Sequence, residues 1–494
     1  MRYQDLPMSE AAELRLALTE SLPTVDQAGN ADMRDPAFTF VPPSHAKALD
    51  VDSSVVEGIR GSGKSFWWEH LASDAHRSYI ESAYPDVRLG SSFDAVQAFG
   101  AQSISTQAPS QDVLTALLKT YSARAIWRAV LAHCAGFGSP FPASAKWVER
   151  VKWVVEQPEE FDELLRVKDA QLDTNGRTLV VLFDALDRLA DEWTTIRPLA
   201  RALLQLALDV RSTRRIRFKV FLRPDMLQDK EIIGFPDASK LLARKAELRW
   251  QRADLYALMF QCVGNAPHGG VAFRQLTTEA TDQAFTLVNN AWILPRALRS
   301  DEKLQERLFE RLAGSAMASG PSGYKRGKPY TWLVNHLLDG LGQVSPRSYS
   351  EAIRHAAQHT PSDAQTALHF RAIQVGVQAA SKIRVNEVTT EDYPWIEFVM
   401  QPLRGKLTVP CAADDFEQLW VKNHTIEQLK EQLAQSSLGV KLPPQSLNRG
   451  STGLLDDLQA LGLIERLRDQ RIQVPDVYRL GFGFGRRGGV KPLK

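Results

Sequence analysis

Unbroken runs of apolar residues mark the strands that this sequence predicts. Residues 179–183 (LVVLF) form such a run, which is typical of a strand buried on both faces of a parallel sheet. Residues 216–222 predict a second strand, and residues 51–57 predict a shorter one. Because these runs alternate with helical stretches from residue 51 to about 250, we expect an α/β domain with a mostly parallel sheet.

Helical spacing predominates outside the strands. Residues 9–20 predict a short helix, and residues 22–50, which are rich in Pro, Asp and Asn, predict an ordered linker. Residues 112–132 predict a further helix between the strands. From about 253 to 360 the pattern is mostly helical, except for a glycine- and lysine-rich loop at 314–329. Three tryptophans between 91 and 170 are expected in the core or on a partner-binding face: Trp127, Trp147 and Trp153.

Composition and charge restrict the kind of protein and the location that we expect. The chain has 494 residues, of which 44% are hydrophobic and 24% charged, and this predicts a globular protein of about two to four domains. A net charge of +2 means that any nucleic-acid-binding surface must be local. The three cysteines lie far apart in the sequence, which fits a reducing cytoplasm. Residues 1–19 do not resemble a signal peptide and no apolar run has the length of a membrane span, so we expect a cytoplasmic protein without membrane contact.

The segment between the first strand and its following helix carries the strongest chemical signal. Residues 58–65 (GIRGSGKS) match the phosphate-loop pattern G-x-x-x-x-G-K-[ST] at every fixed position. In such a loop the glycines let backbone N–H groups face phosphates, the lysine reaches the β- and γ-phosphates, and the serine holds Mg²⁺. The alternative is a glycine-rich turn that matches by chance. The residues expected to bind ATP are Gly58, Arg60, Gly61, Ser62, Gly63, Lys64, Ser65 and Phe66. Residues 38–43 (FTFVPP) precede this loop, as a wall of an adenine pocket or as a packed connector.

An acidic residue follows the most apolar strand. Asp184 comes directly after residues 179–183, and ligands bind parallel sheets at this carboxyl end of the strands. We expect Asp184 to hold Mg²⁺ together with Ser65. Asp187, three residues later, is expected to orient the attacking water. The alternative is that Asp184 only caps the next helix.

Three arginines are candidates for contact with bound phosphate. Arg223 follows the strand at 216–222 and either contacts the γ-phosphate or is a surface residue fixed by the turn at Pro224. Arg296 and Arg347 each follow a proline, where a helical lid can present them to phosphate. The alternative for each is that Pro and Arg only begin a helix and do not contact phosphate. Arg347 is the better candidate of the two.

The C-terminal segment has a pattern of its own. After residues 361–412, which look helical and then extended, helices are expected at 416–435 and 453–461. Two short strands around a charged turn at 468–471 then complete a pattern similar to a winged helix-turn-helix. Residues 464–494 carry eight basic and three acidic residues, so this region binds double-stranded DNA or is a protein-protein module. Phe482 and Phe484 either stack on bases or dock the tail onto the body.

These motifs, in this order over residues 45–360, resemble the additional-strand phosphate-loop ATPases. The resemblance is closest to the bacterial STAND and KAP-like branch, which neighbours the AAA+ and Orc/Cdc6-type ATPases. It rests on residues 58–65 and 179–188 and, more weakly, on the Arg-Pro at 223–224. It implies a protein that binds Mg·ATP and acts as a homo-oligomer or a nucleotide switch. Expected catalytic residues are Lys64, Asp184, Asp187, Arg223 and Arg347, and the expected metal ligands are Ser65 and Asp184.

One departure from the related pattern bears on activity. Typical AAA+ proteins have Glu directly after the magnesium Asp, but here that position is Ala185, so hydrolysis must depend on Asp187 and is expected to be slow. Two functions remain open. In the first, the nucleotide state controls oligomerisation and engagement of DNA or an effector, in bacterial antiphage defence or mobile-element biology. In the second, a slow nucleotide switch acts only through a protein partner.

The expected fold class is α/β, with a parallel-sheet phosphate-loop core, a helical lid and a C-terminal winged-helix-like domain. The expected domains are an N-terminal helix and linker (1–45), the ATPase core (46–252), the lid (253–360), a connector (361–412) and the winged-helix-like domain with its basic tail (413–494).

Overall fold

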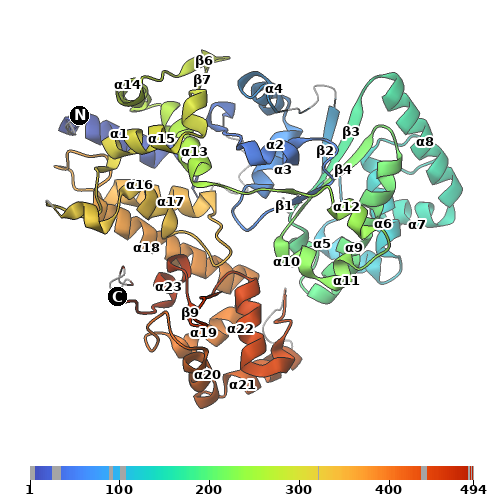
Figure 1. Ribbon diagram of the computed structural model, residues 1–494. Helices are drawn as coiled ribbons and strands as arrows, with labels where there is room; N and C mark the ends of the chain where they lie inside the picture. Colours follow the sequence, from blue (N-terminus) through green and yellow to red (C-terminus); the bar gives the residue numbers. More distant parts are fainter. Residues whose placement is uncertain are drawn as a thin grey trace. The chain divides into compact units, whose positions relative to one another are not determined.

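The computed structural model describes residues 6–24, 35–87, 89, 93–100, 107–320, 322–435, 442–487, 490 and 492. These residues form two compact units (Figure 1). The sheet unit contains residues 41–249. The helical unit contains the described residues up to Phe40 and everything described from Trp250 onward.

A parallel five-stranded sheet forms the centre of the sheet unit. Its strands are β1 (Val55–Glu57), β2 (Phe93–Phe99), β3 (Thr178–Phe183), β4 (Ile216–Leu222) and β5 (Ala246–Glu247), in the order β2-β3-β4-β1-β5. All neighbouring strands are parallel. One strand, β4, therefore separates β1, which precedes the phosphate loop, from β3, which precedes Asp184. This confirms the predicted α/β phosphate-loop core and its additional strand.

The first strand is shorter than predicted. β1 begins at Val55, whereas the sequence pattern predicted a strand from residue 51. The Asp50 carboxylate accepts a hydrogen bond from the Asp52 backbone N–H at 2.9 Å, and the Ser53 N–H donates to the Asp50 carbonyl at 3.0 Å. This local side-chain turn competes with extended pairing, so the chain enters the sheet only after it.

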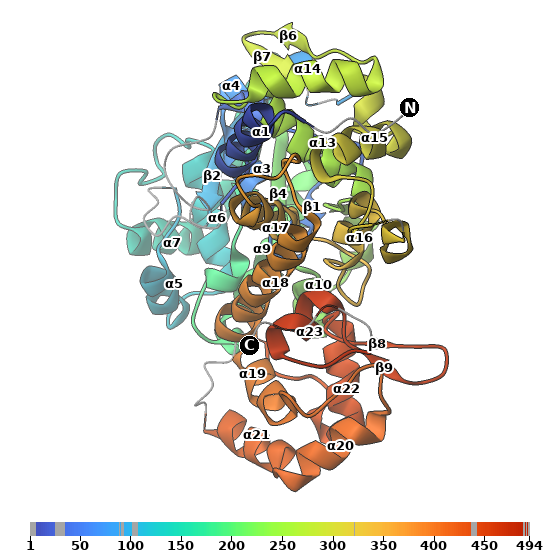
Figure 2. The ribbon, with the colours of Figure 1, turned by 90° about the vertical axis from the view of Figure 1, so that its left-hand side faces the viewer.

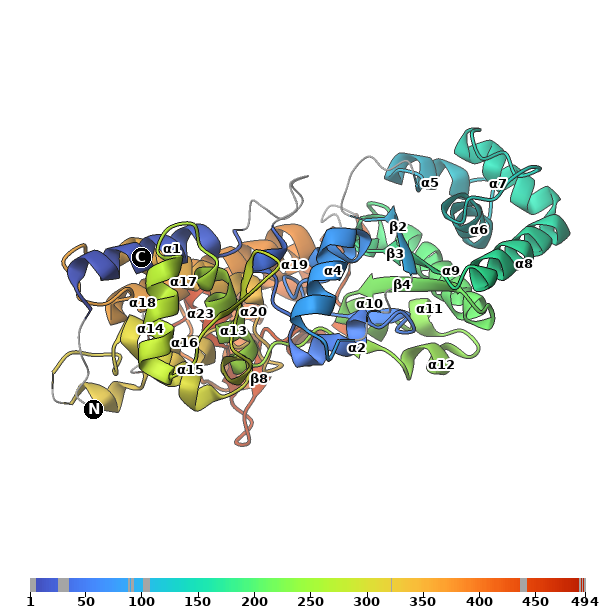
Figure 3. The same cartoon turned by 90° about the horizontal axis from the view of Figure 1, so that it is seen from above.

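Helices cover both faces of the sheet. They are η3 (Pro43–His45), α2 (Ala46–Leu49), α3 (Lys64–Ala72), α4 (Asp74–Ala83), α5 (Gln111–Leu118), α6 (Ala123–Cys134), α7 (Trp147–Glu156), α8 (Pro158–Thr174), η4 (Leu186–Arg188), α9 (Trp193–Asp209), η5 (Val210–Ser212), α10 (Pro224–Gln228), α11 (Lys230–Ile233) and α12 (Ala238–Leu242). The connection from β1 to β2 and the one from β2 to β3 run in opposite directions along the sheet. Because such crossovers are right-handed, α3 and α4 lie on one face and α5–α8 on the other (Figure 3).

The helix predicted at 112–132 is two helices. α5 ends at Leu118 and α6 begins at Ala123, where the Ser122 hydroxyl accepts a hydrogen bond from the Ala125 N–H at 3.2 Å. The N-cap therefore starts a new helix. In α6, Trp127 is fully buried against Phe183, with ring centroids 5.7 Å apart. Its indole N–H donates to the Leu199 carbonyl at 2.8 Å, so this tryptophan is a core residue, as expected.

The helical unit contains four groups of elements, and the sheet unit lies between the first and the second in the chain. The first is α1 (Met8–Ser21) with η2 (Pro36–Phe38). The second is α13 (Arg252–Gly264), α14 (Gly270–Thr281), β6 (Thr286–Val288), β7 (Ala291–Ile293), η6 (Arg296–Arg299), α15 (Glu302–Ala313), η7 (Gly323–Arg326), α16 (Pro329–Asn335) and α17 (Pro346–His359). The third is α18 (Phe370–Asn386), η8 (Glu387–Asp392), α19 (Pro394–Met400) and η9 (Gln401–Leu403). The fourth is α20 (Ala413–Lys422), α21 (Thr425–Ala434), η10 (Leu447–Arg449), α22 (Gly450–Ala460), β8 (Glu465–Arg466), β9 (Ile472–Gln473) and α23 (Asp476–Phe482).

The hairpin β6–β7 was not predicted from the sequence. Asn289 and Asn290 join its strands with φ angles of 48° and 66°. Two residues with positive φ are what the commonest two-residue hairpin turn requires, and asparagine tolerates them well. The Asn-Asn pair between short apolar stretches was therefore a usable signal.

The C-terminal region forms the expected elements with two differences. The helix predicted at 416–435 is broken at His424, whose φ of 49° ends α20 and starts α21. The two strands around the charged turn are present as the antiparallel pair β8–β9, which projects from the neighbouring helices (Figure 2). An unpredicted helix, α23, follows and packs on α18, where the Ser381 hydroxyl donates to the Val477 carbonyl at 2.7 Å. The described part of 413–494 consequently belongs to the same compact unit as α13–α19.

A search of the described helices for membrane spans gives none that has both the length and the apolar character needed to cross a bilayer.

A buried lysine ties β4 to the turn before β1. Lys219 is 1% exposed, and its ammonium group donates hydrogen bonds to the backbone carbonyls of Ala48, Asp50 and Ser53 at 2.8, 2.8 and 2.9 Å. Burial lowers the pKa of Lys219 to about 7. The three carbonyls belong to the segment that leads into the phosphate-loop strand, so this contact fixes where that strand begins.

Replacing Lys219 by Met should lower the free energy of unfolding by about 2–4 kcal/mol, because the apolar side chain leaves buried carbonyls without donors. Urea denaturation of the two proteins measures this difference. The matched control is Lys240→Met, because the Lys240 side chain is 68% exposed and should change stability by less than about 0.5 kcal/mol. Equal losses in the two variants would contradict a structural role for Lys219.

Candidate functional site

The phosphate loop joins β1 to α3 at the carboxyl end of the sheet, and its shape requires glycine. Gly61 and Gly63 have φ angles of 74° and 102°, in the region that side chains with a Cβ rarely adopt. A Cβ atom at Gly58 would lie 2.2 Å from the Ser62 hydroxyl oxygen. α3 begins at Lys64, so the positive end of its dipole lies at the loop. The predicted loop is therefore present as a strand, turn and helix.

Lys64 lies over the backbone of this loop. Its ammonium group donates hydrogen bonds to the carbonyls of Gly58 and Ile59 at 2.8 and 2.9 Å. Burial lowers the pKa of Lys64 to about 8, and the nearby Arg223 lowers it too, while the carboxylate of Asp184 opposes the shift. These charges act on one another, so the fold brings the predicted lysine, aspartate and arginine into one electrostatic cluster.

Ser65 and Asp184 meet at the ends of β1 and β3. The Ser65 hydroxyl donates to a carboxylate oxygen of Asp184 at 2.6 Å, although 119 positions separate the two residues in the sequence. Asp184 is 1% exposed, and its backbone N–H donates to the Phe99 carbonyl of β2 at 2.8 Å. Burial raises the pKa of Asp184, and the hydrogen bond from Ser65 and the charge of Lys64 lower it.

This arrangement fits Mg·ATP. A hydroxyl and a carboxylate are oxygen ligands of the kind that Mg²⁺ prefers, and Mg²⁺ at phosphate sites takes only one or two protein ligands. The glycine-shaped loop and the start of α3 supply backbone N–H groups for phosphate. Ser65 and Asp184 are the residues that would hold the metal ion, and Lys64 would supply the cation for phosphate. Among the described residues there is no group of three or more His, Cys, Asp or Glu side chains placed to bind a metal ion by themselves.

Arg223 and Asp187 lie beside each other at the ends of β4 and β3. A guanidinium nitrogen of Arg223 is 3.7 Å from a carboxylate oxygen of Asp187. The other side of the guanidinium contacts the carboxylate of Asp225 through two hydrogen bonds, at 2.9 and 3.2 Å. Asp225, which the sequence reasoning missed, is buried in the first turn of α10. The signal was an acidic residue two positions after the strand-end arginine.

The turn after Asp184 carries backbone strain. Ala185 has φ 53° and ψ 41°, in the left-handed region that alanine disfavours. The turn leads directly into η4, which contains Asp187. Strain of this kind gathers at functional sites, where the surrounding structure holds it in place.

A second residue that the sequence reasoning missed is Glu69. It lies one helical turn after Ser65 on α3. Burial raises its pKa, and the charge of Asp184 raises it further. The spacing of four residues from the phosphate-loop serine places it on the same side of the helix and could have identified it.

The remaining predicted residues have other surroundings. Phe66 stacks on His70, with ring centroids 3.6 Å apart. Arg347, the second residue of α17 in the helical unit, donates to the Glu387 carboxylate at 2.9 Å. Arg296 begins η6 in the same unit. Their predicted contacts with phosphate stay predictions, as does the adenine wall at 38–43, which is divided between the two units.

Some basic and aromatic residues of 464–494 are buried in the protein, and others are exposed. Phe482 and Phe484 are 1% and 0% exposed and stack on each other, which contradicts base stacking and favours docking. Arg479 is fully buried, pairs with Asp476 and donates to the Phe484 carbonyl at 3.0 Å. Between residues 464 and 487, the exposed basic residues are Arg468, Arg471, Arg486 and Arg487. Lys491 and Lys494 lie outside the described residues.

Comparison with known proteins gives no family assignment. No family model matches the sequence, and no curated protein matches it. Among solved structures, the Aeropyrum pernix ORC2 protein is 12% identical in its ADPNP-ADP complexes, with a TM-score of 0.37 over 90% of this chain and 93% of that chain. Its ADP form is 13% identical, with a TM-score of 0.34 over 89% and 93%. CDC6P from Pyrobaculum aerophilum is 11% identical, with a TM-score of 0.29 over 90% and 94%. Likeness at this level carries no argument about function, which rests on the geometry above.

Ala185→Gly should raise the free energy of unfolding by up to about 1 kcal/mol, because glycine adopts the left-handed conformation without strain. Thermal unfolding measures the change. Ala170→Gly is the matched control. Ala170 is exposed inside α8, four residues before the helix ends, so glycine there should lower stability by about 1 kcal/mol. A loss of similar size in both variants would show that the turn after Asp184 is not strained.

Proposed function

We propose that this protein binds Mg·ATP at the phosphate loop of the sheet unit and hydrolyses it slowly. The observation that carries this proposal is the hydrogen bond of 2.6 Å between Ser65 and Asp184, beside the ammonium group of Lys64. A chance glycine-rich turn would not bring the serine to a buried aspartate at the end of β3, which β4 separates from β1. The same hydrogen bond argues against Asp184 being only a helix cap, since its carboxylate accepts from Ser65.

Each residue of the cluster has a chemical task in this proposal. The residues of 58–66 bind the phosphates, with Lys64 at the β- and γ-phosphates. Ser65 and Asp184 hold Mg²⁺, and Asp187 orients the attacking water. Arg223 neutralises charge that develops on the γ-phosphate. Turnover is slow because Ala185 stands where related ATPases have Glu, and because the Asp187 carboxylate already faces a guanidinium.

Arg223 also offers a way for the protein to distinguish ATP from ADP. Its guanidinium lies between the carboxylates of Asp187 and Asp225. A γ-phosphate would compete with Asp187 for this cation, so the contacts at the ends of β3 and β4 would differ between the two nucleotides. We propose that this difference controls homo-oligomerisation and the engagement of a partner. The setting in antiphage defence or mobile-element biology stays a prediction from the family resemblance.

Lys64→Ala should abolish measurable ATP turnover and weaken ATP binding by more than about tenfold, because it removes the cation from the phosphate loop. Asp184→Asn should lose Mg²⁺-dependent binding, whereas Asp187→Asn should bind Mg·ATP normally and lose turnover. Calorimetry and phosphate release measure these effects, and light scattering with ATP and with ADP measures assembly. The matched control is Lys47→Ala, whose amino group donates to the Lys245 carbonyl on an exposed part of the same unit. Equal ATP binding by wild type and Lys64→Ala would overturn the proposed site.

The C-terminal elements favour a winged helix that binds a protein over one that contacts DNA bases. We propose that α19, α20–α21, α22 and the hairpin β8–β9 form this winged helix, with Cys411 joined to Ile472 of β9 by an isolated antiparallel bridge. α22, which follows the helix pair, contains Asp456 and Asp457 and no lysine or arginine. Asp456 pairs with Arg449 and Arg466, and Asp457 is buried. With no cation of its own, this helix offers little attraction to DNA phosphates. The effector alternative is therefore favoured over contact with DNA.

Binding of the full-length protein to a double-stranded DNA probe should be weak, and independent of Arg468 and Arg471 at the hairpin tip. Fluorescence anisotropy of wild type and of Arg468→Ala/Arg471→Ala over a range of salt concentrations measures this. Tight binding by wild type that the double variant loses, with a salt slope smaller by about two, would instead establish DNA contact through the hairpin.

A further inference from the structure

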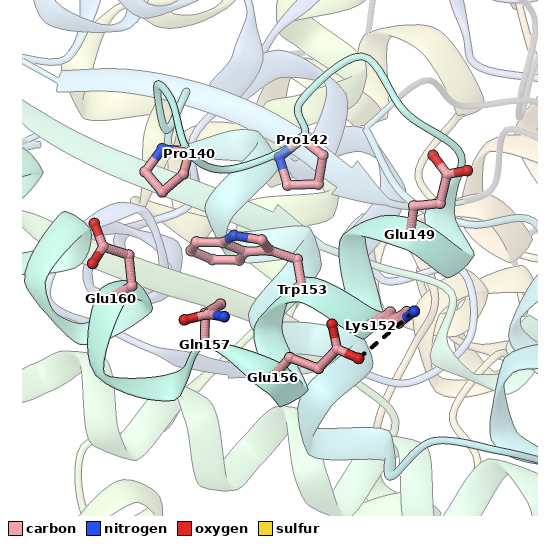
Figure 4. Close-up of a pocket in the computed structure, with 8 residues that line it drawn as sticks. All are labelled: Pro140, Pro142, Glu149, Lys152, Trp153, Glu156, Gln157 and Glu160. Atoms are coloured by element: carbon pink, nitrogen blue, oxygen red, sulfur yellow. Dashed lines mark ion pairs between the residues drawn. The ribbon is translucent and has the colours of Figure 1, made fainter.

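A surface cavity of about 480 Å³ lies among the helices between β2 and β3. None of the residues of the proposed nucleotide site lines it. Its lining residues come from the α6–α7 loop, from α7 and from the start of α8 (Figure 4): Pro140, Pro142, Glu149, Lys152, Trp153, Glu156, Gln157 and Glu160. The indole ring of Trp153 lies in the middle of this set, with the two prolines on one side and Gln157 on the other. The cavity thus has an aromatic centre and proline walls.

The indole is held in place from behind. Trp153 makes an edge contact with Phe141, at 5.4 Å between ring centroids, and Phe141 is 4% exposed. Trp153 itself is only half-buried, so part of its ring remains accessible. Aromatic faces attract cations, most strongly the face of tryptophan. A fixed and accessible indole is therefore a preformed surface for a flat or compact cation.

The charges around the indole favour the same kind of ligand. Three glutamates line the cavity against one lysine, and the lysine pairs only loosely with Glu156, at 3.7 Å between exposed groups. Within the described parts of the chain, neither Glu149 nor Glu160 has an ion-pair partner. A guanidinium group suits this arrangement better than an ammonium group, because it stacks on an aromatic ring while its N–H groups reach carboxylates at the edge.

The surface beside the cavity points to a protein as the source of the cation. Val148 and Val155 lie on α7, one on each side of Lys152, and are 47% and 51% exposed. The two valines lie along one side of the helix, two turns apart, so a peptide can cover them together with the cavity, whereas a free small ion cannot. We propose that this cavity binds an arginine side chain from a basic segment of a partner protein, with apolar neighbours of that arginine covering Val148 and Val155.

The test uses the full-length protein and a fluorescein-labelled peptide of sequence Gly-Val-Arg-Val-Gly, with fluorescence anisotropy at physiological ionic strength. Wild type should bind this peptide at least about tenfold more tightly than the same peptide with citrulline, which keeps the shape of arginine and lacks its charge. Glu149→Gln/Glu160→Gln should lose about tenfold in affinity. Trp153→Leu should lose a similar factor, and if it does not fold, the glutamate variant carries the test.

Two controls separate this site from general attraction to acidic surfaces. Asp112→Asn/Glu163→Gln removes the same number of charges from exposed positions on α5 and α8 and should bind the arginine peptide as wild type does. Lys64→Ala should also bind it normally, so failure of this proposal is distinguishable from failure of the nucleotide site. A photo-reactive residue in place of one peptide valine should cross-link within residues 138–160. Equal affinity for arginine and citrulline peptides, equal losses in the control variant, or cross-links elsewhere would each overturn the proposal.

Discussion

The hydrogen bond between Ser65 and Asp184 is the contact on which the proposed site depends. It joins the phosphate loop after β1 to the end of β3, across the intervening strand β4. It forms because parallel strands bring their carboxyl ends to one edge of the sheet, so that residues far apart in sequence become neighbours. Lys64, Asp187 and Arg223 come to the same edge for the same reason, each from a loop that follows one of these strands.

The buried charged groups of this protein are stabilised by different contacts. Lys219 donates to three backbone carbonyls, and Arg479 donates to two backbone carbonyls and pairs with the carboxylate of Asp476, so both serve to fix the chain. Lys64 also contacts carbonyls, but these belong to a loop shaped to receive phosphate, and its pKa of about 8 leaves it mostly protonated near neutral pH. The contacts of Lys219 and Arg479 are therefore structural. A bound phosphate, by contrast, can replace the carbonyls that Lys64 contacts.

The helices between β2 and β3 have an inner and an outer surface with different roles. Their inner surface covers the sheet, where Trp127 packs on Phe183. Their outer surface carries the half-buried Trp153 and the exposed Val148 and Val155. The long crossover between adjacent parallel strands thus supplies both the packing of the sheet and a surface on which a partner can dock, while the nucleotide cluster remains at the strand ends.

The sequence by itself determined the elements whose signals are local. The phosphate-loop pattern, the apolar strands at 179–183 and 216–222 and the aspartate after the first of these were all readable, because a buried strand and a glycine turn each need particular residues within a few positions. Only the tertiary structure decided which side chains meet. It placed Asp225 on Arg223 and Glu69 near Asp184, buried Phe482 and Phe484, and held Arg347 on Glu387. These outcomes depend on strand order and helix packing between distant segments, which no local spacing encodes.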